Sequence, residues 1–303
     1  MQTVEILRTL VGFPTISAQP NTDLITYCAD LLRDAGAEVV IIRDPDQAKA
    51  NLYATIGPKD RAGVLLSGHT DVVPVDGQNW TKPPFTLTEE DGKLFGRGTT
   101  DMKGFVASAL SAALRASKLE LETPLHLALS YDEEVGCLGV RSLIDMLAAA
   151  PFRPRFCIVG EPTQMMVGTG HKGKTACRLR CTGREGHSAL APMALNAIHL
   201  ACDMISALRD IQSDISRTTL PDDAYDIAYS TLHVGRINGG GALNIVPNSA
   251  EFLFEIRNLP ADDPQFILDR LHRACAPASG FPGGQYRNRD HRQLPSTGNG
   301  ARC

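Results

Sequence analysis

The chain has 303 residues and a formal net charge of −4 at pH 7, with 43% hydrophobic and 21% charged residues. This length accommodates two domains of roughly 100–200 residues each, and the composition is typical of a globular protein. A mildly acidic chain without a basic run lacks the electrostatic footprint of a nucleic-acid-binding protein, and no stretch reaches the ~18 consecutive apolar residues of a membrane-spanning helix.

The N-terminal segment MQTVEILRTL is amphipathic and contains Glu5, which is not the pattern of a signal peptide. The eight cysteines form no CxxC pair and show no regular spacing. In a chain of this length such cysteines are typically reduced thiols that act as small apolar residues. We therefore expect a cytoplasmic protein with no membrane or nucleic-acid partner.

Helices and strands are predicted to alternate over the first half of the chain. One apolar stripe at helical spacing predicts a helix at the start: Val4, Leu7, Leu10 and Val11. Further helices are predicted at 23–35, 103–116 and 139–149, and strands at 38–43, 51–56, 64–67, 125–130 and 156–160. The strand at 64–67 is a continuous apolar run, as in strands buried on both faces of a sheet, and the strands at 125–130 and 156–160 are likewise predicted to be buried. The alternation predicts a three-layer α/β domain over residues 1–168.

The pattern changes at about residue 169. Strands are predicted at 175–182, 229–234 and 250–257, and helices at 196–211 and 263–274. This order predicts a small α+β domain over residues 169–275. Residues 276–303 are rich in Gly, Pro, Arg and Asn, with almost no apolar periodicity, which predicts a disordered tail.

A histidine and an aspartate follow the first of the apolar strands. In SGHTDVVP (67–74), His69 and Asp71 are two residues apart and therefore lie on the same side of an extended chain. A metal-bound imidazole commonly donates its second N–H to a carboxylate or carbonyl, so this pair suits a metal ligand and the residue that orients it. Alone, such a pair is more often an ordinary turn.

Three further segments place carboxylates beside predicted strands or helices. In GRGTTDMKG (96–104), Asp101 precedes a helix and could instead be its N-cap. SYDEEVGCLG (130–139) holds Asp132, Glu133 and Glu134, which could instead form an exposed acidic turn, and Glu161 follows the last apolar strand in FCIVGEPT (156–163). Because strand ends face one crevice in this architecture, we expect these groups to meet. Imidazole and carboxylates together suit Zn²⁺ or Co²⁺.

In this order, these segments resemble the family of dinuclear amidohydrolases that includes acetylornithine deacetylase, succinyl-diaminopimelate desuccinylase, aminoacylase and carboxypeptidase G-type enzymes. The resemblance covers residues 1–275. It implies a three-layer metallopeptidase-like catalytic domain with an inserted α+β lid domain that forms a homodimer, and two Zn²⁺ or Co²⁺ ions per subunit. It also implies these roles: His69 and Glu161 on the first ion, Glu134 on the second, Asp101 bridging both, Asp71 orienting His69, and Glu133 as the general base.

Matching segments of the second domain imply substrate contacts. His187 in GREGHSALAP (183–192) matches a histidine that enters the partner's active site and stabilises the oxyanion, although alone it reads as an exposed histidine. Asn244 and Arg257 in NGGGALNIVPNSAEFLFEIR (238–257) match substrate-contacting positions, and Arg257 suits a carboxylate. Alternatively, Asn244 could be an amide that only stabilises a turn, and Arg257 could be an ordinary surface charge on a strand. YDEEVGCLG, GHKGK and VGRINGGGALNIVP resemble the acetylornithine deacetylase branch most, which implies hydrolysis of N2-acetyl-L-ornithine to L-ornithine and acetate in arginine synthesis.

The sequence departs from the family pattern after residue 275. Family members continue with a segment that returns to the first domain and supplies a histidine to the second ion, and no segment here matches it. Back-translated with permitted codons and read one nucleotide later, the residues from Arg287 onward can encode AIEITGSYPALEMARD, which resembles that segment. We therefore expect an aberrant, frameshifted tail, an incomplete second ion site and impaired activity.

Three alternatives remain open at this point. The chain could act on another N-acyl amino acid, as a deacylase or desuccinylase. It could be a catalytically inactive, truncated pseudoenzyme that still binds one metal ion or dimerises through its lid. It could also be an unrelated α/β binding protein with acidic strand ends, which would bind no metal.

Overall fold

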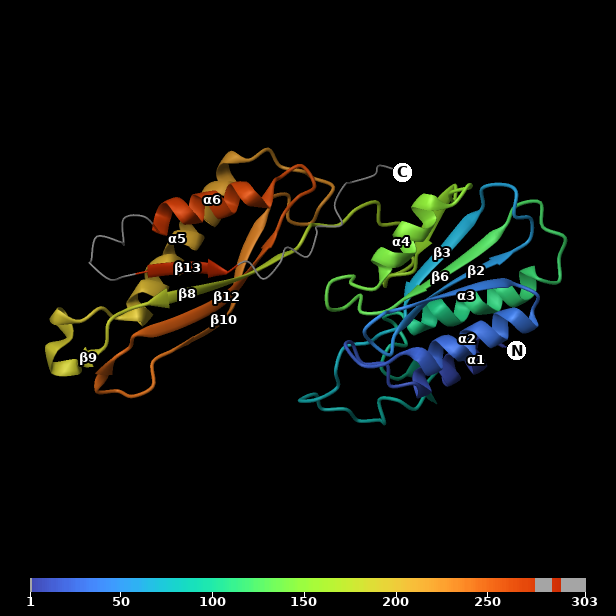
Figure 1. The fold of residues 1–303 in the computed structure, drawn as a ribbon, viewed down its shortest axis with the longest axis horizontal. Coiled ribbons are helices and arrows are strands. Elements are labelled where there is room, and N and C mark those ends of the chain that lie inside the picture. The colour runs from blue at the N-terminus through green and yellow to red at the C-terminus, as the bar shows by residue number, and fades with distance from the viewer. Residues whose placement is uncertain (1, 276–284, 290–303) are drawn as a thin grey trace. The chain divides into compact units, whose positions relative to one another are not determined.

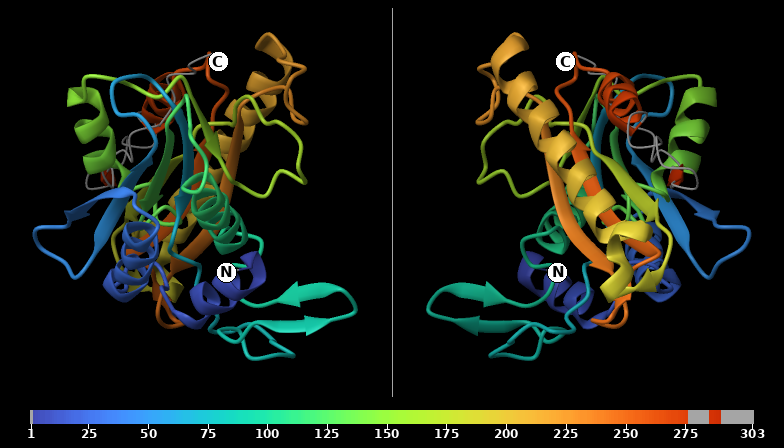
Figure 2. Two further views of the ribbon diagram at one scale, coloured as in Figure 1. Left: turned by 90° about the vertical axis from the view of Figure 1, so that its right-hand side faces the viewer. Right: turned by 90° about the vertical axis from the view of Figure 1, so that its left-hand side faces the viewer.

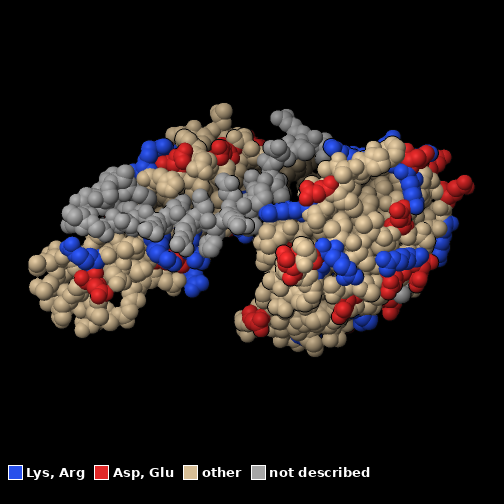
Figure 3. Space-filling model, viewed as in Figure 1, with Lys and Arg blue, Asp and Glu red and all other residues tan. Residues whose placement is uncertain are grey.

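The computed structural model describes residues 2–275 and 285–289 and divides the chain into two compact units, Met1–Val167 and Gly168–Cys303 (Figure 1). The division falls one residue before the boundary expected from the sequence. On the face drawn in Figure 3, Lys and Arg side chains are interspersed with Asp and Glu. Over the described residues, the structure contains no helix that is both long and apolar enough to cross a membrane.

The first unit is built on a five-stranded sheet with the order β1-β2-β6-β3-β7. Its strands are β1 (Glu38–Arg43), β2 (Ala50–Ile56), β3 (Val64–His69), β6 (Leu125–Ser130) and β7 (Phe156–Val159). Its helices are α1 (Thr3–Gly12), α2 (Thr22–Asp34), α3 (Lys103–Ala116) and α4 (Val140–Ala149). The sequence did not predict the hairpin of β4 (Thr88–Glu90) and β5 (Lys93–Phe95), which projects from this unit in Figure 2.

Two pairings in this sheet are parallel, and they fix where the strands end. β3 pairs in parallel with both β6 and β7, whereas β1–β2 and β2–β6 are antiparallel. In register, His69 lies opposite Ser130 and Ser67 lies opposite Val159. The carboxyl ends of β3, β6 and β7 therefore lie together at one edge of the sheet.

Helices cover both faces of the sheet, so the predicted three-layer arrangement is confirmed. The main core packs the buried stripes of α1, α2 and α3 against β2 and β6. A smaller cluster on the other face contains Leu65, Ala128 and Leu143, the last of these from α4. Figure 1 shows α4 on the side of the sheet opposite to α1–α3.

Strand β7 was expected to be buried, and that expectation is wrong. Phe156, Ile158 and Val159 are each about half exposed (50%, 46% and 57%). The reason lies in the strand order, because β7 is the edge strand and its only neighbour among the described strands is β3. A continuous apolar run therefore predicts a strand but not its burial, which depends on the position of the strand in the sheet.

The second unit has a four-stranded sheet with the order β10-β12-β8-β13. Its strands are β8 (Thr175–Thr182), β10 (Thr231–Gly239), β12 (Ser249–Arg257) and β13 (Gln285–Arg289). The helices α5 (Ala197–Thr218) and α6 (Pro264–Cys275) pack on one face over a single apolar core (Figures 1 and 2). β9 (Gly186–His187), the 3-10 helix η1 (Ser188–Met193) and β11 (Ile245–Val246) form a small separate element.

Two features of this unit differ from the sequence-based expectations. Helix α5 extends seven residues beyond the predicted end at residue 211. Its N-cap is Asn196, whose side chain accepts hydrogen bonds from the N–H groups of Ile198 and His199. In the predicted disordered tail, residues 285–289 form β13, which pairs antiparallel with β8. The rest of that tail lies outside the described residues.

Candidate metal centre

The parallel strand ends bring the predicted ligands together in the first unit. His69 is the last residue of β3, Glu133 and Glu134 follow β6, and Glu161 follows β7. Asp101 comes from the loop that leads into α3. Residues separated by up to 92 positions in the sequence therefore meet because three neighbouring strands end at the same edge of the sheet.

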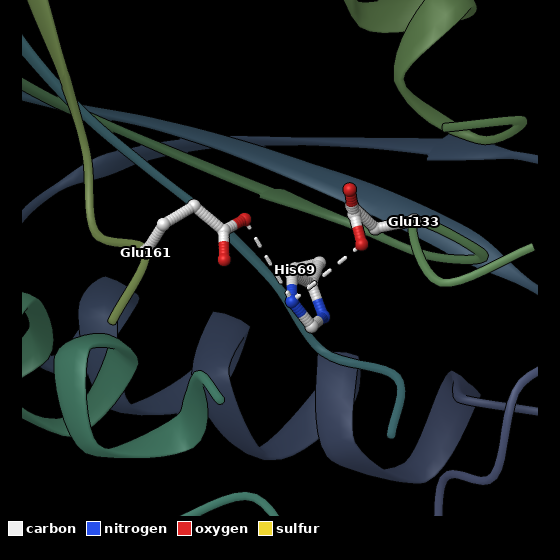
Figure 4. A group of neighbouring side chains, drawn as sticks. All are labelled: His69, Glu133 and Glu161. Carbon is white, nitrogen blue, oxygen red and sulfur yellow. Dashed lines mark ion pairs between the residues drawn. The ribbon is translucent and has the colours of Figure 1, made fainter. Parts of the chain in front are cut away.

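His69 is at the centre of this group and is almost fully buried (2% exposed). Its Nδ1 lies 2.9 Å from the carbonyl oxygen of Asp71, so this nitrogen is engaged by the backbone and Nε2 is the ring nitrogen left to face a metal ion. Nε2 lies 3.1 Å from Oδ1 of Asp101. It lies 3.9 Å from carboxylate oxygens of both Glu133 and Glu161, as Figure 4 shows. The imidazole thus faces three carboxylates with Nε2.

The donor atoms form two overlapping groups, each with the geometry to hold a metal ion. One group consists of His69, Glu133 and Glu161, and the other of His69, Asp101 and Glu134. Within each group all ligand atoms lie within 4.8 Å of one another. One imidazole nitrogen and several carboxylate oxygens are donors that suit Zn²⁺ and similar divalent ions.

The electrostatics of the site also fit a cation. Burial alone would lower the pKa of His69, but the hydrogen bond and charge of Asp71 and the charges of Glu133 and Glu161 outweigh it and raise the pKa to about 9. The pKa of Glu134 is raised by burial and by the neighbouring charge of Asp101. Like charges held this close disfavour the ionised form unless a positive charge lies among them, and a divalent cation would supply that charge.

Asp71 has a wider role than the orientation of His69. Its Oδ1 lies 3.5 Å from Nδ1 of His69, farther than the backbone carbonyl does. Its carboxylate accepts hydrogen bonds from the N–H groups of Glu133 (3.0 Å) and Glu134 (3.3 Å) and from the Ser17 hydroxyl (2.7 Å). Burial would raise the pKa of Asp71, but the hydrogen bonds with His69, with the Ser17 hydroxyl and with the N–H of Glu133 outweigh it and lower the pKa. One buried carboxylate therefore holds both the histidine and the two glutamates.

The structure also decides between the alternatives for the acidic segments. Asp101 is not the N-cap of α3, because Met102 occupies that position and no side chain caps the helix. The Asp132–Glu134 segment is not an ordinary exposed acidic turn, because Asp132 is only 4% exposed. Sequence reasoning gave no role to Ser17, Lys49 or Asp132, since an isolated serine or lysine in a loop carries no recognisable pattern.

Of the predicted substrate residues, two lie close together in the second unit and one does not. His187 in β9 is directly opposite Ile245 of β11, and the carbonyl of Asn244 accepts a hydrogen bond from the N–H of Ser188 (3.0 Å). Arg257 lies at the far end of β12, opposite Thr231, and its Nε donates to Glu255 (3.1 Å). The side chain of His187 accepts from the N–H of Ala189 (3.2 Å).

Comparisons with known proteins agree with this site. The model of peptidase family M20/M25/M40 matches residues 65–277. Acetylornithine deacetylase of Shigella sonnei (strain Ss046) is 38% identical over 283 residues, which are 91% of this chain and 73% of that protein.

Three solved structures share the fold at low sequence identity. The M20 family metallo-carboxypeptidase Sso-CP2 from Sulfolobus solfataricus matches with a TM-score of 0.70 and 19% identity, over 96% of this chain and 78% of that one. Human carnosine dipeptidase 1 matches with a TM-score of 0.69 and 18% identity, over 95% and 76%. The YXEP protein of Bacillus subtilis, described as a dinuclear metal-binding peptidase, matches with a TM-score of 0.62 and 17% identity, over 95% and 72%.

The three-layer fold and the strand-end cluster of imidazole and carboxylates define a metal-dependent amidohydrolase. The family match covers well over half of the chain, and the chain belongs to peptidase family M20/M25/M40.

Proposed function

We propose that the chain hydrolyses N2-acetyl-L-ornithine to L-ornithine and acetate, a reaction of arginine synthesis, in the cytoplasm. The observation that carries the proposal is the meeting of His69, Glu133 and Glu161 at one sheet edge, with Nε2 of His69 turned toward both carboxylates. The substrate is taken from the acetylornithine deacetylase of Shigella sonnei, which is 38% identical to this chain.

The ions that this centre would hold are Zn²⁺ or Co²⁺. His69 and Glu161 would bind the first ion, Glu134 the second, and Asp101 both. Bound divalent ions polarise an amide carbonyl and lower the pKa of a water molecule. The chain itself supplies the rigid frame, because the orienting group Asp71 is buried and hydrogen-bonded on both carboxylate oxygens.

Glu133 is proposed as the general base. Its backbone N–H is held by Asp71, and its carboxylate lies 3.9 Å from Nε2 of His69. From this position the carboxylate would accept the proton of the attacking water and deliver it to the amine nitrogen of the leaving ornithine. A positioned carboxylate that relays a proton in this way contributes roughly 10²–10⁴-fold to the rate.

We also propose that the activity is impaired by competition for one imidazole. Both ligand groups use His69, and its Nδ1 is engaged by the carbonyl of Asp71, so Nε2 can coordinate only one ion at a time. The second ion would then be held by carboxylates alone among the described residues. A weakly held second ion gives less polarisation of the carbonyl and slower turnover.

Substrate recognition and assembly are proposed for the second unit. His187 and Asn244, which lie on adjoining segments, would contact the acyl amide. Arg257 would bind the substrate carboxylate in place of Glu255, its present partner. We propose a homodimer through this unit, so that His187 would serve the partner's site.

The experiment is a hydrolysis assay with purified protein, supplied in turn with Zn²⁺ and Co²⁺. The substrates are N2-acetyl-L-ornithine, N-succinyl-diaminopimelate and N-acetyl-methionine. Slow, metal-dependent release of ornithine that exceeds release from the other two supports the proposal. A preference for either of the other substrates would assign the chain to a different N-acyl amino acid. If fully metal-loaded protein hydrolyses none of the three, the chain is a metal-binding pseudoenzyme.

A further inference from the structure

We propose that the buried ion pair of Lys49 and Asp132 is a positioning element for the metal centre. It fixes the turn after β6 so that Glu133 and Glu134, although consecutive in sequence, present their carboxylates to different ligand groups around His69. The inference rests on the metal centre of the proposed function. It assigns a role to two residues that belong to neither ligand group.

The first observation is the burial and complete pairing of Asp132. The side chains of Lys49 and Asp132 are 2% and 5% exposed. Nζ of Lys49 donates to Oδ2 of Asp132, and Oδ1 accepts a hydrogen bond from the N–H of Ala18 (2.9 Å). Both carboxylate oxygens are therefore tied to loops that lie far from β6 in the sequence.

The second observation is the backbone of Asp132. Its φ angle is +53°, in the left-handed region that a residue other than glycine adopts only at a cost in free energy. The turn that follows is closed by hydrogen bonds from the N–H groups of Gly136 and Cys137 to the carbonyl of Glu133 (2.8 Å each) and from Leu138 to the carbonyl of Asp132 (3.0 Å). Two non-glycine residues of this turn have a positive φ, Asp132 and Cys137 (+53° each), and the ion pair lies at the first of them.

The third observation is what the turn does to the two glutamates. Glu133 belongs to the ligand group with Glu161, and Glu134 belongs to the group with Asp101. Asp71 accepts the backbone N–H of both glutamates, so their orientation is set from two sides, by Asp71 and by Asp132. Asp132 belongs to neither ligand group.

A purely stabilising role explains the pair poorly. Removing two charges from water costs free energy that their mutual attraction often fails to recover, so replacing a buried ion pair by apolar residues is often neutral for stability. A pair that fixes one backbone conformation beside metal ligands has a clearer physical benefit. Partners that orient metal ligands typically change metal affinity by roughly 10- to 100-fold when they are removed.

The test is Zn²⁺ titration by calorimetry of metal-depleted wild-type protein and of the double variant Lys49→Met/Asp132→Gly. The double variant leaves no unpaired buried charge, and glycine adopts a positive φ without strain, so folding is favoured. We expect it to fold, as judged by circular dichroism, and to bind the tight Zn²⁺ equivalent at least roughly 10-fold more weakly. A folded double variant with wild-type Zn²⁺ affinity would overturn the proposal.

Two further variants serve as a control and as a substitute for the double variant. Thr55→Val removes the hydrogen bond between Thr55 and His126 (2.9 Å) at the opposite end of β6, and it should leave Zn²⁺ affinity unchanged. If the double variant does not fold, Asp132→Asn keeps the side-chain shape and is titrated instead, with the same two outcomes. Because the readout is metal binding, a wild-type protein that binds Zn²⁺ but does not hydrolyse acetylornithine overturns the substrate assignment and leaves this test intact.

Discussion

Nε2 of His69 lies 3.1 Å from Oδ1 of Asp101, although the two residues are 32 positions apart in the sequence. Apart from His69, both candidate ligand groups consist of carboxylates. His69 is therefore the only nitrogen donor in the two groups, and it faces the carboxylates of Asp101, Glu133 and Glu161. The behaviour of the whole centre depends on what this imidazole binds.

Metal stoichiometry should reflect the shared imidazole. Since both ligand groups of the described chain require His69, we expect one tightly bound ion per chain and a second that binds much more weakly. Calorimetric titration of metal-depleted protein with Zn²⁺, checked by elemental analysis after dialysis, measures this directly. Two ions of equal, high affinity would mean that a further donor completes the second group.

Changing Glu133 to Gln should separate turnover from metal binding. The substitution keeps the side-chain shape and removes the proton acceptor, so we expect kcat to fall by roughly 10²–10⁴-fold, as for the loss of a general base. The tight ion should remain bound, because His69, Glu161 and Asp101 are unchanged and the glutamine amide keeps an oxygen donor next to His69. Comparable turnover by the variant and the wild type would show that another group accepts the proton.

Gly160 should not tolerate a larger side chain. A Cβ at this position would lie 1.8 Å from the ring of Phe105, and the next residue is the ligand Glu161. We expect Gly160→Ala to destabilise the first unit by about 1–3 kcal/mol, as for overpacking of a core, and to weaken Zn²⁺ binding. Urea unfolding and Zn²⁺ titration test the two effects. Gly241→Ala, where no atom lies within 4 Å of the added Cβ, is the matched control.

The stability of the first unit should decrease in mild acid because of His126. Burial lowers the pKa of His126 below its ordinary value of 6.5, so below pH 6.5 the unfolded chain takes up a proton that the folded chain resists. The unfolded state then binds more protons, and the free energy of unfolding falls as the pH falls through this window. Urea midpoints measured at pH 7.5 and 5.5 should differ more in the wild type than in His126→Gln. Because all other titrating groups are common to both proteins, an equal difference would contradict this role.

Much of the fold could be predicted from local patterns. Strands β1, β6 and β8 and helix α3 have the predicted bounds, because their apolar periodicity and their glycine or polar boundaries are local signals. The β4–β5 hairpin and the short β9 and β11 were missed, since segments of two or three residues have no measurable periodicity. The exposure of β7 depends on which strand lies next to it, and a single run of apolar residues does not encode that.

The candidate site likewise contains residues that could be predicted from the sequence and residues that could not. The donors His69, Asp101, Glu133, Glu134 and Glu161 could be named because each follows a recognisable strand or glycine-rich segment, and the structure brings them together. The residues that hold these donors in place could not be named. Ser17 and Lys49 are brought to Asp71 and Asp132 by loops, and such contacts depend on tertiary structure alone.

The most direct test of the metal centre is Co²⁺ titration of the metal-depleted wild type and of His69→Ala, followed by calorimetry and by visible absorption. Since Nε2 of His69 is the nitrogen shared by both ligand groups, we expect the tight equivalent and its absorption bands to be lost in the variant while the protein remains folded. A folded His69→Ala protein that binds Co²⁺ with wild-type affinity and an unchanged spectrum would contradict the assignment of the centre to these residues.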